Sequence, residues 1–230
     1  ISFGLALLSQ WLGRTLLIYI HSNPNIPSII KPVLQSAGWL QDISIASYYT
    51  IIVVLLLLLP KRAYFIVGFQ SLFLFLQSLV LLVDYYLLKT WSCKINRQAL
   101  DYLSYPQEIL NSLATEDKLY IILGLLILFL GLFFLGKLTL HLCRYHQLQF
   151  SSKWILIPLL ALCIIGARGG INNIPLSLGS AQKTNNRLYN ALSTNSLWNL
   201  FYAYQQPSLD ENIKKALMPA EMEQRALDKY

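Results

Sequence analysis

The sequence predicts an all-α polytopic membrane protein with five transmembrane helices and further amphipathic helices at the membrane surface. Three observations predict this: 55% of the 230 residues are hydrophobic, only 13% are charged, and the mean hydropathy is +0.49. A soluble domain usually carries about 25% charged residues, so the composition excludes an ordinary soluble enzyme. The basic residues behind the net charge of +7 stand singly or in pairs between apolar blocks, as charges do beside membrane spans. Nucleic-acid binding would need them clustered on one face.

Five segments have the length and apolar content of a membrane-spanning helix, which takes about 20 residues. They are residues 3–20, 43–59, 63–88, 119–140 and 150–167. Pro60 ends the second segment, and Pro158 lies inside the fifth. The sequence therefore predicts a transmembrane domain over residues 1–168, followed by juxtamembrane helices and a stalk over residues 169–230. The chain begins with Ile1 inside an apolar stretch, which is typical of part of a longer protein.

Two stretches outside these segments have the spacing of amphipathic surface helices. In the first, the apolar positions are Leu100, Leu103, Ile109, Leu110 and Leu113. In the second, residues 185–206, polar residues alternate with apolar ones too often for a sixth span. We expect this second stretch to form a helix along the outer surface, with Trp198 and Phe201 on its buried face.

The basic residues also predict the orientation. The connectors at 60–62 and 137–153 carry Lys61, Arg62, Lys137, Arg144 and Lys153 and no acidic residue. The connectors at 21–42 and 89–118 are longer and carry as many acidic as basic residues. Connectors rich in Lys and Arg remain cytoplasmic, so the C-terminal part is expected to be extracytoplasmic.

Four charged residues are expected near the outer ends of the spans. At about 1.5 Å per residue, Arg14 lies roughly 9 Å and Asp84 roughly 6 Å inside their spans. Asp42 begins the second span and Arg168 ends the fifth. One hypothesis is that these four residues bind a lipid headgroup, because arginine grips phosphate in a bidentate manner. The alternative is two ion pairs that neutralise each other.

Gln70, Gln77 and Asp84 recur every seven residues and share one face of the third span. Hydrogen bonds between helices are the structural interpretation of this face, and a lined transport path is the functional one. The sequence offers no catalytic nucleophile–base pair and no cluster with metal-ligand spacing; His141, Cys143 and His146 do not share a helix face.

One set of residues runs from the end of the third span into the connector that follows it: Val83-Asp84-Tyr85-Tyr86, Trp91, Ala99-Leu100-Asp101-Tyr102-Leu103 and Pro106-Gln107-Glu108. This set resembles a motif of the lipoteichoic-acid synthase-like family of phosphoglycerol transferases. Gln107 stands where the family often has Lys, and Leu87 where it often has Phe. Further similar pieces are Gly38 with Asp42-Ile43-Ser44, Arg168-Gly169-Gly170, and the segment around Asn195.

The resemblance implies five N-terminal spans joined to an extracellular domain of the alkaline-phosphatase/sulfatase superfamily. That domain would hold a Thr nucleophile and a divalent metal ion, usually manganese, and would transfer phosphoglycerol from phosphatidylglycerol. This chain would then be the membrane domain of a transferase in the bacterial cytoplasmic membrane, with lipids and its own catalytic domain as partners and no cofactor of its own. The alternative from another class is a small standalone transporter or channel.

Overall fold

The computed structural model describes residues 2–21, 27, 29–59, 62–105, 107–108, 111, 115–116, 118–122, 124–125, 137, 156–171 and 174–208. Every element within these residues is helical. The elements, in chain order, are α1 (Ser2–His21), α2 (Ile30–Ala37), α3 (Trp39–Leu56), α4 (Arg62–Trp91), α5 (Arg97–Tyr102), α8 (Leu156–Arg168), the 3₁₀ helix η2 (Leu178–Ala181), α9 (Arg187–Ser193) and α10 (Ser196–Gln205).

Among the residues that the structure describes, three stretches are long and apolar enough to cross a membrane: Phe3–His21, Ile30–Leu56 and Tyr64–Trp91. They correspond to the first three predicted spans, although α3 begins at Trp39, earlier than predicted, and continues from α2 after a turn at Gly38. The apolar α8 is shorter; it overlaps the predicted fifth span, 150–167, and ends one residue beyond it. Most of the predicted fourth span, 119–140, lies outside the described residues, as does the stalk beyond Ser208. The all-helical class is confirmed, and five crossings remain a prediction.

Three hydroxyl side chains in these apolar helices bond the preceding turn of their own helix. Thr15 Oγ1 donates to the carbonyl of Trp11 at 2.7 Å, and Thr50 Oγ1 donates to the carbonyl of Ala46 at 2.7 Å. Ser78 Oγ reaches the carbonyl of Leu74 in the same way, at 2.8 Å. A side chain that bonds the preceding turn needs no water, so these residues fit a helix surrounded by apolar groups.

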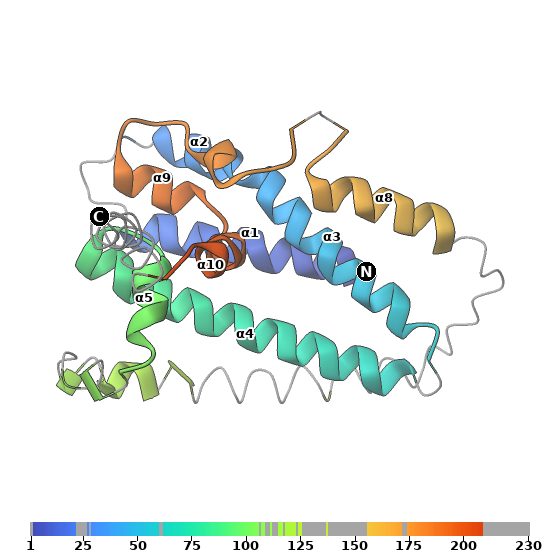
Figure 1. The fold of residues 1–230 in the computed structure, drawn as a ribbon, viewed down its shortest axis with the longest axis horizontal. Helices are drawn as coiled ribbons and strands as arrows, with labels where there is room; N and C mark the ends of the chain where they lie inside the picture. The colour runs from blue at the N-terminus through green and yellow to red at the C-terminus, as the bar shows by residue number, and fades with distance from the viewer. Residues whose placement is uncertain are drawn as a thin grey trace, which may run out of the picture.

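The long helices run side by side, and the short ones gather at one end (Figure 1). α1, α3 and α4 pack against each other, and α8 lies along α3. Gly166 allows the α8 contact, because a Cβ atom there would collide with the Ser47 hydroxyl. Ser44 Oγ donates to the carbonyl of Ala167 at 2.5 Å, so the end of α8 lies beside the first turns of α3.

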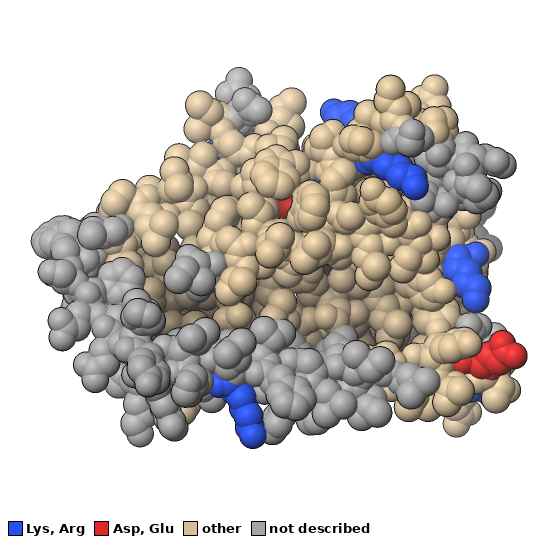
Figure 2. Space-filling view, turned by 180° about the vertical axis from the view of Figure 1, so that it is seen from behind, with Lys and Arg blue, Asp and Glu red and all other residues tan. Residues whose placement is uncertain are grey.

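Apolar side chains also cover much of the outside of this bundle. Leu8, Leu12 and Leu16 lie four residues apart on α1 and are 50%, 51% and 56% exposed. Among the described residues on the face shown in Figure 2, uncharged side chains cover most of the centre, with a small acidic spot between them, and most Lys and Arg lie at the end with the short helices. Such a continuous apolar surface is typical of contact with membrane lipid.

The prediction of one helix over residues 185–206 was wrong. The segment forms α9 and α10, with an extended break at Thr194 and Asn195. Asn195 caps α10 and accepts a hydrogen bond from the backbone N–H of Trp198 at 3.0 Å. Phe201, expected on the face buried at the membrane surface, is 55% exposed on the outside of the folded chain, whereas Ala203 and Ser196 are buried inside it; contact of Phe201 with the membrane stays a prediction.

Candidate functional site

A network of buried polar side chains joins the long helices to the short ones. Its centre is an ion pair between Arg14 of α1 and Asp42 of α3, whose side chains are 1% and 0% exposed. Arg14 Nη1 also donates to the carbonyls of Gln35 at 2.6 Å, Leu34 at 3.3 Å and Ser193 at 3.4 Å. The guanidinium of Arg14 therefore links its own helix, α1, to α2, α3 and α9.

Asn195, in the break between α9 and α10, completes the bonding of Asp42. Its Nδ2 donates to Asp42 Oδ1 at 2.8 Å and to Gln10 Oε1 at 2.9 Å. Its backbone N–H donates to Gln41 Oε1 at 2.8 Å. Both carboxylate oxygens of Asp42 are thus bonded, one to Arg14 and one to Asn195. A buried ion pair is tolerated only with such additional hydrogen bonds.

The network continues into α4 through one of the glutamines that recur along it. Gln77 Oε1 accepts hydrogen bonds from Gln10 Nε2 and from Ser9 Oγ, both at 2.9 Å. Gln77 is 4% exposed, whereas Gln70, one repeat earlier, is half-buried. The hydrogen bonds at Gln77 match the structural interpretation of the polar face of α4.

Asp84, the third member of that face, belongs to a second buried cluster. Its Oδ1 accepts a 2.9 Å hydrogen bond from the backbone N–H of Ile95. Beside it, Lys94 is 3% exposed and its Nζ donates to the carbonyl of Thr194 and, at 3.2 Å, to Ser196 Oγ. Burial lowers the pKa of Lys94 from its usual 10.5 to about 8, an effect that the nearby Asp84 opposes.

Sequence reasoning missed Lys94 and Gln41. Both lie in segments that it treated as solvated connectors, and their burial results from α9 and α10 packing over the end of the bundle. Nothing in the local sequence distinguishes Lys94 from an exposed lysine.

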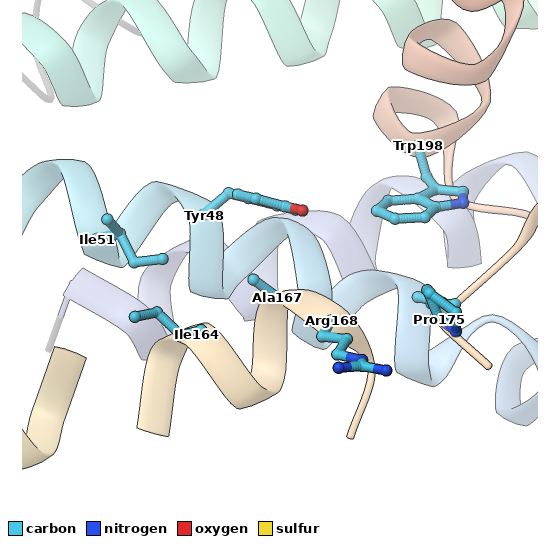
Figure 3. A pocket seen from close by; sticks show the side chains of 8 residues that line it. Tyr48, Ile51, Ile164, Ala167, Arg168, Pro175 and Trp198 are labelled. Atoms are coloured by element: carbon cyan, nitrogen blue, oxygen red, sulfur yellow. The ribbon is translucent and has the colours of Figure 1, made fainter. Parts of the chain in front are cut away.

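Arg168 lies in a different environment from Arg14. It ends α8, is exposed, and lines a cavity of about 320 Å³ (Figure 3). The residues lining this cavity come from α3, α8, the following loop and α10; they are Tyr48, Ile51, Ile164, Ala167, Arg168, Pro175, Leu176 and Trp198.

The chain turns sharply after Arg168 and closes this cavity on one side. Gly169 and Gly170 have φ angles of +87° and +121°, which favour glycine. The N–H of Leu176 then donates to the carbonyl of Arg168 at 3.1 Å. This hydrogen bond brings Pro175 and Leu176 back against the end of α8, where they form a wall of the cavity.

The four charged residues predicted to bind a lipid headgroup therefore occupy three environments. Arg14 and Asp42 form the buried ion pair, and Asp84 lies beside Lys94. Arg168 is exposed in the cavity wall, where a ligand can reach it. The alternative prediction was that the four charges form two ion pairs with each other. The Arg14–Asp42 ion pair is present.

The described residues contain no group of three His, Cys, Asp or Glu side chains that could hold a metal ion. What they offer chemically is a buried polar network and an open cavity with one arginine in its lining. Comparison with protein-family models, with curated proteins and with solved structures found no match to the chain.

Proposed function

We propose that this chain is the membrane domain of a sulfatase-like phosphoglycerol transferase, and that it anchors an extracytoplasmic catalytic domain and holds it in position. One observation carries the proposal: Asn195, the cap of α10, bonds Asp42 and Gln10 of the long helices. Under the proposal, residues 194–208 with α10 form the exit segment, which would lead to the catalytic domain. A simple anchor needs only apolar helices. A polar network that fixes the exit segment is what a domain with a positioning role requires.

The residues that carry the family resemblance support this role. Several of them form the buried contacts at the junction, the end of the bundle where α9 and α10 pack on the long helices. Asp42 and Asn195 are partners in the network, and Asp84 holds the backbone of Ile95. A Cβ atom on Gly38 would collide with the carbonyl oxygen of Ser193 and the guanidinium of Arg14. These motif residues lie far apart in the sequence, but they meet at one junction. The packing there explains why each residue type stands at its position.

The proposal includes the five spans, the bacterial cytoplasmic membrane and an extracytoplasmic C-terminal part. The end of the bundle with α2, α5, α9 and α10 would face outward, because the basic connectors leave from the other ends of the spans. Chemistry would take place in the catalytic domain, which in the family holds a Thr nucleophile and a divalent metal ion, usually manganese, and uses phosphatidylglycerol as donor.

The test uses the protein expressed from its complete gene and reconstituted in vesicles that contain phosphatidylglycerol with a labelled acyl chain. Transfer of the headgroup releases labelled diacylglycerol, which is measured with manganese present. Replacing Asn195 by Leu should reduce this release several-fold per folded molecule. Hydrolysis of a water-soluble glycerol phosphodiester should be unchanged, because the catalytic domain itself is intact.

Asn186→Ala is the matched control, because Asn186 caps α9 through its side chain but is exposed and lies outside the buried network. Absence of diacylglycerol release by the unaltered protein would overturn the proposed function. Equal losses on both substrates in Asn195→Leu would overturn the positioning role. If the chain were instead a transporter, vesicles would show a solute flux that Gln77→Leu abolishes.

A further inference from the structure

The cavity beside Arg168 has the chemistry of a lipid-headgroup site at a membrane surface. Its two ends differ: Ile51 and Ile164 lie at one end, and Arg168, Pro175 and Trp198 lie towards the other (Figure 3). The hydroxyl of Tyr48 points from the apolar end towards Trp198. A phospholipid has the same polarity, with apolar chains on one side of a charged phosphodiester.

The apolar end opens onto a surface that suits acyl chains. Ile164 is 61% exposed, and Ile157, seven residues earlier on the same face of α8, is 60% exposed. Exposed aliphatic side chains in an apolar helix are typical of lipid contact. A soluble anion would gain nothing from this surface.

The polar end suits an anionic headgroup. The guanidinium of Arg168 can donate two parallel hydrogen bonds to phosphate oxygens, and tyrosine and tryptophan are the side chains preferred at headgroup depth. The cavity volume of about 320 Å³ is at the lower end of the range for ligand sites, so it takes a headgroup and the first part of one acyl chain, while the rest of the lipid remains outside.

We propose that this cavity binds one anionic phospholipid, with its phosphate at Arg168, its headgroup hydroxyls beside Tyr48 and Trp198, and an acyl chain along Ile51 and Ile164. The inference deepens the proposed function and rests on it in one respect: the bound lipid would be the phosphoglycerol donor, held near the catalytic domain. Because Trp198 belongs to α10, the lipid would touch both the spans and the exit segment.

Binding is tested on the complete protein in detergent by native mass spectrometry, with phosphatidylglycerol, phosphatidylcholine and glycerol 3-phosphate as probes. Phosphatidylglycerol should bind with one tight site. Arg168→Gln should weaken that site about tenfold or more, and Arg168→Lys should weaken it less, since lysine keeps the charge but loses the fork. Glycerol 3-phosphate should not compete at equal concentration.

Two further variants separate binding from folding. Ile164→Trp fills the apolar end from an exposed position without changing a charge, so it should also block phosphatidylglycerol. Lys183→Gln removes one positive charge from an exposed position outside the cavity and should leave binding unchanged. Thermal unfolding in detergent verifies that each variant is folded.

Equal affinity for phosphatidylglycerol and phosphatidylcholine, or unchanged binding in both Arg168→Gln and Ile164→Trp, would overturn the proposal. Full competition by glycerol 3-phosphate would identify a site for soluble phosphate instead. The assay needs no turnover, so its failure is distinct from failure of the proposed function. Selective binding without diacylglycerol release would support the cavity and overturn the transferase.

Discussion

Asn195 Nδ2 donates a 2.8 Å hydrogen bond to Asp42 Oδ1 across a sequence separation of 153 residues. This bond connects the first turn of α3 to the break before α10, and the Arg14 guanidinium bonds the other oxygen of the same carboxylate. Three segments far apart in the chain thus depend on one carboxylate, which makes the end of the bundle a single structural unit.

Replacing Asn195 by Leu should destabilise the folded protein by about 2–4 kcal/mol. The substitution removes the cap of α10 and leaves two buried oxygens, Asp42 Oδ1 and Gln10 Oε1, without the Asn195 donor. Thermal unfolding in detergent measures the effect. Asn186→Ala, which removes only an exposed cap, should cost about 1 kcal/mol; equal losses would contradict the network.

The stability that the Arg14–Asp42 ion pair gives the folded protein should require both partners. Arg14→Met leaves a buried carboxylate without its counter-charge and should cost about 3–5 kcal/mol. Adding Asp42→Leu should restore part of that stability, because the uncompensated charge is gone. The comparison is Arg97→Met, which breaks an ion pair with Asp101 whose side chains are each 31% exposed and should cost under about 1 kcal/mol. A double variant less stable than Arg14→Met would refute this account.

The sequence identified the parts of this architecture that depend on local pattern. Apolar length predicted α1, α3 and α4, and depth along the helix singled out Arg14 and Asp42 as charges that need partners. The partner of Asp84 was not predictable, since Lys94 is buried by helices about 100 positions further along the chain. The short helix α2 was missed because its apolar residues are too few to stand out in a connector.

Gly38→Ala should destabilise the protein by about 2–3 kcal/mol, because the added methyl group has no room between the carbonyl of Ser193 and the guanidinium of Arg14. Gly68, inside α4, has no atom within 4 Å of an added Cβ. Gly68→Ala should therefore be neutral or stabilising by up to about 1 kcal/mol, from helix propensity alone. Unfolding midpoints of the two variants, measured side by side, give the difference; similar midpoints would argue against the close approach at Gly38.

Stability should rise with pH above about 8, because burial lowers the pKa of Lys94 to about 8 in the folded protein while the unfolded chain keeps its usual 10.5. Between these values the unfolded state binds more protons, so raising the pH favours the folded state, by at most about 3 kcal/mol. Asp84 and Asp42 oppose the shift and Arg14 adds to it. Unfolding midpoints from pH 7.5 to 10 should increase.

Lys94→Met should flatten this dependence, even though the loss of charge beside Asp84 lowers stability at every pH. Lys183→Met, at an exposed position, should retain the increase. A decrease of the midpoint over the same range in the unaltered protein would show that other groups dominate.

The orientation can be measured with single cysteines in a variant whose Cys93, Cys143 and Cys163 are replaced by serine. Gln182→Cys lies at an exposed position after η2, and Lys137→Cys lies at the start of the basic connector 137–153. Lys and Arg favour the cytoplasmic side, so an impermeant maleimide should label Gln182→Cys in intact cells and Lys137→Cys only after permeabilisation. The apolar α8 lies between the two positions, so opposite accessibility also requires that the segment containing α8 crosses the membrane. Labelling of both cysteines from outside would exclude that crossing, and the reverse pattern would invert the assigned orientation while leaving the crossing in place.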